Sequence, residues 1–129
     1  MPLTSVHHIA IICSDYNRSK IFYTEVLGLQ VIREVYRETR RSYKLDLSLN
    51  GHYIIELFSF PETPARASGP EACGLRHLAF ATPDVAAMKK ELETKGILVE
   101  DIRTDEFTGK KFTFFTDPDG LPMEIYESV

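Results

Sequence analysis

The chain has 129 residues, of which 43% are hydrophobic and 26% are charged, and its formal net charge is −4. These values are typical of one globular domain with a buried core, and they exclude disordered and fibrous chains. No segment approaches the ~18 consecutive apolar residues of a membrane span, and no Lys/Arg cluster suits nucleic acid. The start, MPLTSVHH, lacks a signal-peptide pattern, and Cys13 and Cys73 form no CxxC pair. We therefore expect a cytoplasmic protein with two reduced, partly buried thiols and no membrane or nucleic-acid partner.

The first half of the chain predicts a strand, a helix and three further strands. A run of β-branched residues predicts the first strand at 6–12. Apolar residues near helical spacing predict a helix over about 15–27, ended by Gly28. The next strands are expected at 29–37, 42–49 and 53–60, with Asn50-Gly51 as a tight hairpin turn before the last.

The second half predicts the same order of elements after a linker. Residues 61–72 contain three prolines and one glycine and predict a connection without regular structure. A strand is expected at 74–80, followed by a helix with Pro83 at its first position and Gly96 at its end. The remaining strands are expected at 97–103, 111–116 and 121–126, with a turn at 117–120 before the last.

The two halves are related by an internal repeat that keeps its register. Residues 6–11 (VHHIAI) align with residues 75–80 (LRHLAF) at an offset of 69. The last strands of the halves align at an offset of 68, from 54–57 (IIEL) to 122–125 (PMEI). A histidine and a glutamate therefore recur at matching positions, which a chance apolar pattern does not explain.

Four ionisable side chains occupy these repeated positions: His8 and Glu56 in the first half, and His77 and Glu124 in the second. The pairs are 48 and 47 residues apart, and each side chain stands in an apolar row of a predicted strand. A lone carboxylate there carries a large desolvation cost, whereas four such groups can share one divalent cation. Two imidazoles and two carboxylates suit Ni, Co, Mn or Fe, and zinc is also compatible.

The repeated motifs resemble those of a known family, the vicinal oxygen chelate superfamily, which includes glyoxalase I. The resemblance rests on VHHIAI at 6–11, the segment 19–29, LRHLAF at 75–80 and DPDG at 117–120 followed by Glu124. It covers essentially the whole chain and is greatest to the short bacterial glyoxalase I-like proteins. It implies an α+β fold in which two paired βαβββ modules form an open, curved eight-stranded sheet around the metal. The single domain, 1–129, then comprises module 1 (about 5–60) and module 2 (about 73–128).

The resemblance also implies an activity. Extradiol dioxygenases of this superfamily typically leave the second ligand position without a ligand, whereas Glu56 fills it here, which favours the glyoxalase I branch. There the metal chelates adjacent oxygens of a hemithioacetal and stabilises an enediolate, and a metal-bound glutamate moves the proton. Either Glu124 or Glu56 is the base, and we favour Glu124. The alternatives are an Fe(II)-dependent ring-cleaving dioxygenase and a non-catalytic antibiotic-binding protein.

The resemblance leaves the substrate open. Bacterial glyoxalase I enzymes carry an Arg and an Asn that hold glutathione at the positions occupied here by Ile12 and Phe60. We therefore expect a small-molecule substrate that is not recognised as glutathione by that route. Lys44, Asp46 and Arg37 are either anchors for a polar substrate or exposed rim charges. Short members of the superfamily often pair their modules across a dimer, so we expect a homodimer, with the site formed within one chain or across two.

Overall fold

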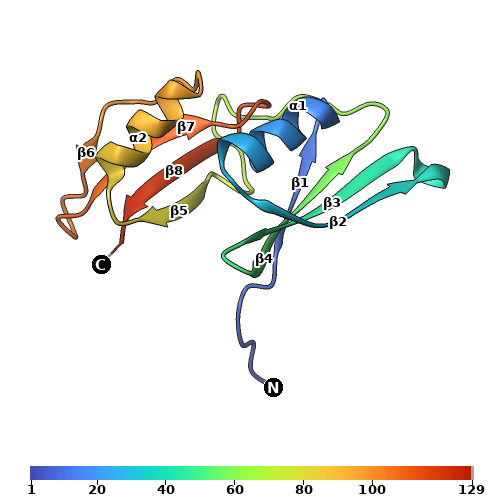
Figure 1. The fold of residues 1–129 in the computed structure, drawn as a ribbon, viewed down its shortest axis with the longest axis horizontal. Helices are drawn as coiled ribbons and strands as arrows, with labels where there is room; N and C mark the ends of the chain where they lie inside the picture. The colour runs from blue at the N-terminus through green and yellow to red at the C-terminus, as the bar shows by residue number, and fades with distance from the viewer. Residues whose placement is uncertain (129) are drawn as a thin grey trace. The chain divides into compact units, whose positions relative to one another are not determined.

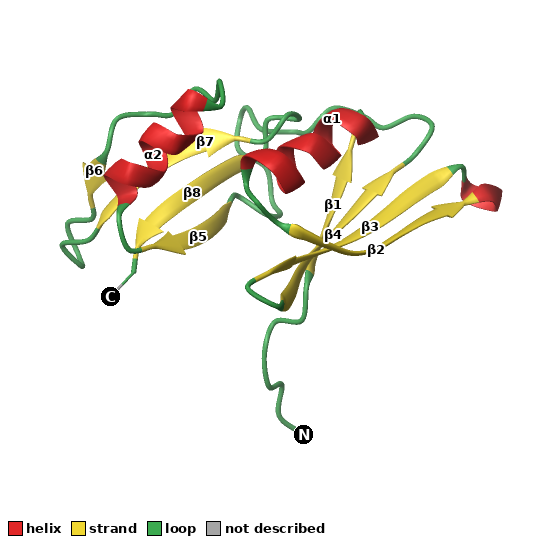
Figure 2. Ribbon diagram, viewed as in Figure 1, coloured by secondary structure: helices red, strands yellow, loops and turns green. Residues whose placement is uncertain are grey.

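The computed structural model describes residues 1–128, in which the chain forms two compact units, Met1–Ala65 and a second that starts at Arg66. Each unit contains one four-stranded sheet (Figure 1). Along the chain, the helices of each unit follow one strand and precede another strand of the same unit. Figure 2 shows that residues 61–72, which span the boundary of the two units, carry no helix or strand, as the sequence predicts. The α+β class and the duplicated βαβββ order are confirmed.

Unit 1 follows the predicted order closely. Its strands are β1 (Ile9–Cys13), β2 (Gln30–Arg37), β3 (Ser42–Leu49) and β4 (His52–Ser59). They lie in the order β1-β4-β3-β2, with β1 parallel to β4 and the other pairs antiparallel. Its helical segments are α1 (Tyr16–Ile21), which continues into the π-helical turn η1 (Phe22–Val26), and the short 3-10 turn η2 (Glu38–Arg40). The helix predicted over 15–27 is therefore one continuous helical segment, which is α-helical in its first part and π-helical in its second.

Unit 2 repeats this topology. Its strands are β5 (Leu78–Thr82), β6 (Arg103–Thr104), β7 (Lys111–Thr116) and β8 (Pro122–Glu127), in the order β5-β8-β7-β6. The parallel pair is β5 with β8. Its helix α2 (Val85–Thr94) contacts β7 and β8 and runs along their face in Figure 1. Among the described residues, no helix is both long enough and apolar enough to cross a membrane.

Aspartate caps start both helices. The side chain of Asp15 accepts the backbone N–H of Arg18, and that of Asp84 accepts the N–H of Ala87, which satisfies donors that a helix N-terminus leaves free. Because Asp84 is the cap, Pro83 precedes it, and the prediction that this proline occupies the first helical position is wrong. In the hairpin between β3 and β4, both Asn50 and Gly51 have positive φ, as the predicted turn requires.

Strand alternation gives each sheet one buried face. In unit 1 the buried face carries Leu45, Leu47, Ile55 and Leu57, all fully inaccessible to solvent. In unit 2 it carries chiefly Phe115, Met123 and Ile125, which are almost fully buried. Residues one position away along each strand point to the opposite face. Glu56 and Glu124 therefore lie on the less buried face of their sheets, hereafter the open face.

Three predicted strands differ from the structure. The strands predicted at 6–12 and 74–80 begin only at Ile9 and Leu78, so His8 and His77 immediately precede β1 and β5 rather than lying within them. The strand predicted at 97–103 is reduced to β6, Arg103–Thr104. In this segment the Glu100 N–H donates to the carbonyl of Phe114 in β7 at 2.9 Å. The Glu100 carbonyl accepts from two side chains instead of a backbone N–H, namely Lys89 Nζ at 2.9 Å and Thr113 Oγ1 at 2.7 Å, which interrupts the strand pairing.

Candidate metal centre

The first predicted ligand pair is brought together in unit 1. Nε2 of His8 lies 3.6 Å from Oε1 of Glu56, although the residues are 48 positions apart. The parallel pairing of β1 with β4 causes this proximity, because Ala10 is the partner of Glu56 and His8 lies two residues before Ala10, just ahead of β1. The side chains are 34% and 16% exposed, so both are partly shielded and still accessible from the open face.

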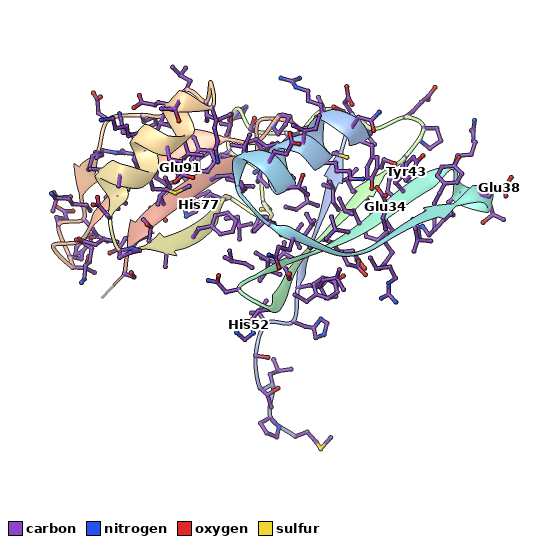
Figure 3. All side chains as sticks on the ribbon, viewed as in Figure 1. Glu34, Glu38, Tyr43, His52, His77 and Glu91 are labelled. Atoms are coloured by element: carbon purple, nitrogen blue, oxygen red, sulfur yellow. The ribbon has the colours of Figure 1, made fainter. Side chains whose placement is uncertain are left out.

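The second pair has the same geometry in unit 2. Nε2 of His77 lies 3.4 Å from Oε1 of Glu124, with side-chain exposures of 30% and 13%. Here Ala79 is the strand partner of Glu124, and His77 again lies two residues earlier. His77 is labelled in Figure 3, close to the sheet of unit 2. The repeat predicted from the sequence therefore reproduces side-chain geometry as well as strand order.

A polar cluster lies beside Glu56 on the open face of unit 1. Asp46 is fully buried, and its two carboxylate oxygens accept from Lys44 Nζ at 2.7 and 2.9 Å. The Tyr53 hydroxyl also donates to Asp46, at 2.8 Å, and Arg33 donates from 3.3 Å. Burial raises the pKa of Asp46, but the hydrogen bonds from Lys44 and Tyr53 outweigh it, so the net pKa lies below the ordinary range. Asp46 is therefore a buried anion held by two cations and a hydroxyl, which excludes the exposed-rim alternative for this residue.

The same donors also contact the candidate ligand. Lys44 Nζ lies 3.2 Å from Oε2 of Glu56, and the Tyr53 hydroxyl lies 3.4 Å from the same oxygen. One carboxylate oxygen of Glu56 thus faces His8 while the other faces Lys44 and Tyr53. Asp46 fixes both of these donors, so it orients Glu56 without touching it through a hydrogen bond.

An aromatic cluster takes the equivalent place in unit 2. Phe114 is the strand partner of Glu124, as Asp46 is of Glu56. Its ring meets the His77 ring edge-on with centroids 5.2 Å apart, and the Arg103 guanidinium lies over Phe114 at 5.6 Å and over Phe112 at 5.0 Å. Among the described residues, the carboxylate of Glu124 has one ion-pair or hydrogen-bond partner, His77.

Sequence reasoning missed two neighbours of His8. Strand alternation predicts that His7 points away from His8, but residues 7 and 8 precede β1, so alternation does not apply to them. Instead Nδ1 of His7 lies 2.8 Å from Nδ1 of His8, and both rings pack against Tyr53, with centroid distances of 5.3 and 5.0 Å. An adjacent His pair is a signal that sequence alone provides, whereas Tyr53 is recognisable only through the strand register.

The two positions that depart from the glutathione-binding pattern are apolar and lie near arginines. Ile12 is 57% exposed on the open face of β1. Phe60 follows β4 and stacks against Phe58, with centroids 6.1 Å apart. The guanidinium of Arg37 lies over both rings, at 4.9 and 5.9 Å, and that of Arg40 lies over Phe60 at 5.4 Å. Arg37 is therefore half-buried against aromatic rings rather than a free rim charge.

The cysteines and the remaining histidine have simpler surroundings. Cys13 is buried and donates to the carbonyl of Phe58 at 3.3 Å, whereas Cys73 is exposed, so the prediction of partial burial is wrong for Cys73. Neither forms a disulfide. His52 is exposed at the β3–β4 turn, as expected from its position in the sequence, and is labelled in Figure 3.

The donor chemistry of the two pairs fits a divalent transition metal. Each pair offers one imidazole nitrogen and one carboxylate oxygen toward the same point, and neutral imidazole with carboxylate suits Ni, Co, Mn, Fe and Zn. Within the described residues, no group of three or more His, Cys, Asp and Glu side chains is gathered at one point. Each unit on its own therefore supplies two ligands, fewer than the three or four that such ions usually take from protein.

Comparisons with known proteins agree with this architecture. The chain is 65% identical over 127 residues to the uncharacterized protein YwkD of Bacillus subtilis (strain 168), covering 98% of this chain and 99% of that protein. It is 33% identical to Glyoxylase I 4 of Arabidopsis thaliana, covering 95% and 70% of the two chains. A crystal structure of a glyoxalase family protein from Enterococcus faecalis superposes with a TM-score of 0.89 at 48% identity, covering 95% and 97%.

A family model matches nearly the whole chain. It covers residues 5–125, which include both His–Glu pairs and most of each unit. The match agrees with the duplicated βαβββ order and with the resemblance seen in the sequence motifs. The chain belongs to the Glyoxalase/Bleomycin resistance protein/Dioxygenase superfamily.

Proposed function

We propose that this chain is a metal-dependent lyase or isomerase of the glyoxalase I type that acts on a small oxygenated substrate. The observation that carries the proposal is the His–Glu pair that recurs, with distances of 3.6 and 3.4 Å, on the open face of both sheets. The 33% identity to a protein named Glyoxylase I 4 supports the same branch of the superfamily.

In this proposal, four side chains hold one divalent ion, and both units contribute: His8, Glu56, His77 and Glu124. Because each unit provides only two of them, the 129 residues act as one functional domain, with the units taken from one chain or from the two chains of a homodimer. A divalent ion bound by these residues supplies Lewis-acid stabilisation of negative charge on adjacent substrate oxygens.

We assign the proton transfer to Glu124. A general base must reach a proton on the substrate carbon and release it again, so it needs freedom to move. Glu56 is held at Oε2 by Lys44 and Tyr53, whereas Glu124 has only His77 as an ion-pair or hydrogen-bond partner among the described residues. Glu56 therefore serves as a fixed ligand, and Glu124 accepts and returns the proton.

The substrate in this proposal is not bound as glutathione is in bacterial glyoxalase I. Ile12 and Phe60 replace the residues that hold that thiol, and neither side chain donates or accepts hydrogen bonds. The guanidinium of Arg37 lies over the rings of Phe58 and Phe60, and this cationic and aromatic surface suits a substrate group other than glutathione. We would screen methylglyoxal with several thiols, and also other small oxygenated compounds. At least one of them is expected to be turned over faster than the glutathione adduct of methylglyoxal.

Metal analysis tests the ligand set directly. Native protein purified without chelators is expected to contain one divalent ion (Ni, Co, Mn, Fe or Zn) per chain by elemental analysis. His77→Ala removes one imidazole and should lower the metal content more than roughly tenfold. His52→Ala is the matched control, because His52 is exposed at the β3–β4 turn and should leave the metal content unchanged.

Three experimental outcomes would contradict the proposed activity. Native protein that contains no divalent metal and also binds neither Ni(II) nor Co(II) in calorimetry contradicts the metal centre. Oxygen uptake with catechols after anaerobic Fe(II) loading, without isomerase or lyase turnover, favours a ring-cleaving dioxygenase instead. Metal binding without turnover of any substrate favours a binding protein.

A further inference from the structure

Unit 2 contains a cavity of about 470 Å³ that the metal ligands alone do not explain. One part of its lining comes from the segment 66–77, including Arg66, Arg76 and His77. The rest comes from Glu100 and Arg103 and from the sheet residues Phe114 and Pro122. The volume is in the range of small-molecule sites, and the lining combines apolar surface with several charged side chains. A proposed metal ligand, His77, thus opens into a cavity of substrate size.

The charges of the cavity are mostly compensated in pairs. Arg76 forms an ion pair with Glu71, and the guanidinium of Arg103 lies 3.5 Å from Glu100. Both arginines are also well exposed, with side-chain exposures of 68% and 54%. Water therefore screens these pairs, and neither arginine needs a ligand.

Arg66 differs from the other two arginines. Among the described residues it has no acidic partner, and its Nη2 donates instead to the backbone carbonyls of Leu75 and Arg76, at 2.6 and 3.4 Å. Its Nε is buried and has no hydrogen-bond partner. A buried donor without a partner is destabilising, and more so when it belongs to a charged group. The side chain thus carries an uncompensated positive charge and a free donor at the wall of the cavity.

The contacts of Arg66 also fix its orientation. Leu75 and Arg76 immediately precede His77, so the bonds from Nη2 tie the guanidinium to the backbone beside the proposed metal ligand. A guanidinium that is already oriented loses little side-chain entropy when it binds an anion, and its planar fork matches a carboxylate or a phosphate group.

We propose that Arg66 binds the carboxylate or phosphate group of a small anionic substrate that occupies this cavity. The inference deepens the proposed function, because it places an anionic group of the substrate in the cavity that His77 lines. The substrate class is then a small oxygenated compound that carries a separate anionic group. A guanidinium binds carboxylate and phosphate groups in the same way, so an experiment is needed to decide which of the two the substrate carries.

The experiment uses the full chain without metal, so that anion binding is measured separately from metal binding. Inorganic phosphate and succinate are titrated into ¹⁵N-labelled protein, and amide shifts of Gly74, Leu75 and Arg76 are followed by NMR. At least one of the two anions is expected to bind saturably, and the tighter one identifies the anionic group. Arg66→Gln should weaken its affinity at least about tenfold, because it removes both the charge and the fork.

Three further variants keep the result interpretable. Arg66→Lys keeps the charge without the fork and should bind with intermediate affinity, even if Arg66→Gln folds poorly. Arg76→Gln should change the affinity less than Arg66→Gln, because Glu71 already compensates Arg76. Arg18→Gln, at an exposed arginine of α1 in unit 1, should have no effect.

The outcomes separate this inference from the proposed function. Equal affinity in the wild type and both Arg66 variants, or no saturable binding of either anion, overturns the anion site. Co(II) titration of the same samples reports the metal centre independently, and Arg66→Gln should bind Co(II) as the wild type does. Loss of Co(II) binding in the wild type with intact anion binding would contradict the metal centre and leave the anion site standing.

Discussion

The two units contain the same His–Glu pair, but different residues surround it in each unit. In unit 1 the strand partner of Glu56 is Asp46, which with Lys44 and Tyr53 forms a polar network around that glutamate. In unit 2 the strand partner of Glu124 is Phe114, and the surroundings are aromatic. The two units therefore share the His–Glu pair but differ in the residues around it, as the proposed roles of one fixed and one mobile glutamate require.

The largest expected effect comes from separating these two roles. Glu124→Gln removes the proposed base and should lower kcat by roughly 10²–10⁴-fold, the usual contribution of general acid–base catalysis. Glu56→Gln should instead act mainly through weaker metal binding, so that added metal restores part of its activity. Steady-state kinetics over a series of metal concentrations check both variants. Rescue of Glu124→Gln by metal, with no rescue of Glu56→Gln, would reverse the assignment.

A smaller effect is expected from the support of Glu56. Asp46→Asn leaves Lys44 and Arg33 beside a neutral group in a fully buried position, so we expect a loss of about 2 kcal/mol in the free energy of unfolding. It should also weaken metal binding roughly tenfold, because Lys44 and Tyr53 lose their anchor. Chemical denaturation and calorimetry measure the two effects.

The matched control for Asp46→Asn is Phe114→Leu, at the equivalent strand position of unit 2. It shortens a half-buried apolar side chain, and we expect a loss of about 1 kcal/mol or less with a smaller change in metal affinity than Asp46→Asn causes. If both variants weaken metal binding equally, the polar network does not orient Glu56 and the comparison between the units fails.

The smallest effect concerns how the helix of unit 1 is joined to its sheet. Glu34 on β2 accepts from Lys20 of α1 at 2.7 Å and from the hydroxyl of Tyr16, whose ring stacks on Tyr43 of β3. Glu34 and Tyr43 are labelled in Figure 3. The hydrogen bonds from Lys20 and Tyr16 hold the pKa of Glu34 below its ordinary value of 4.5. This contact therefore stabilises the fold above about pH 4.5, and the contribution is lost as the pH falls through the lowered pKa.

Glu34→Gln should accordingly cost less than about 1 kcal/mol at pH 7, because the side chain is 35% exposed and screened by water. The difference from the wild type should shrink as the pH falls below about 4, which denaturation across a pH series measures. Glu91→Gln in α2 is the control, since the Glu91 carboxylate, within the described part of the chain, pairs with Lys95 alone on the exposed helix surface. A constant difference at all pH values would show that Glu34 acts through packing rather than charge.

Much of the fold follows from local sequence signals. The hairpin at Asn50-Gly51 and strands such as β3 and β7 lie where the pattern predicts them. The strand predicted at 97–103 fails because Lys89 and Thr113 bond to the carbonyl of Glu100, and these partners are distant in sequence. Hydrogen bonds between residues that are distant in sequence cannot be predicted from the local pattern of apolar residues.

The sequence by itself determined the duplication, the superfamily and the four candidate ligands, because a repeated register of His and Glu is a local, periodic property. Only the tertiary structure decided what stands beside each glutamate, since strand pairing brings Asp46 to Glu56 and Phe114 to Glu124 from distant parts of the chain. It also decided that Asp46 is a buried anion and that Arg66 is tied to the backbone before His77. Charge compensation depends on three-dimensional neighbours, and residue types alone do not specify them.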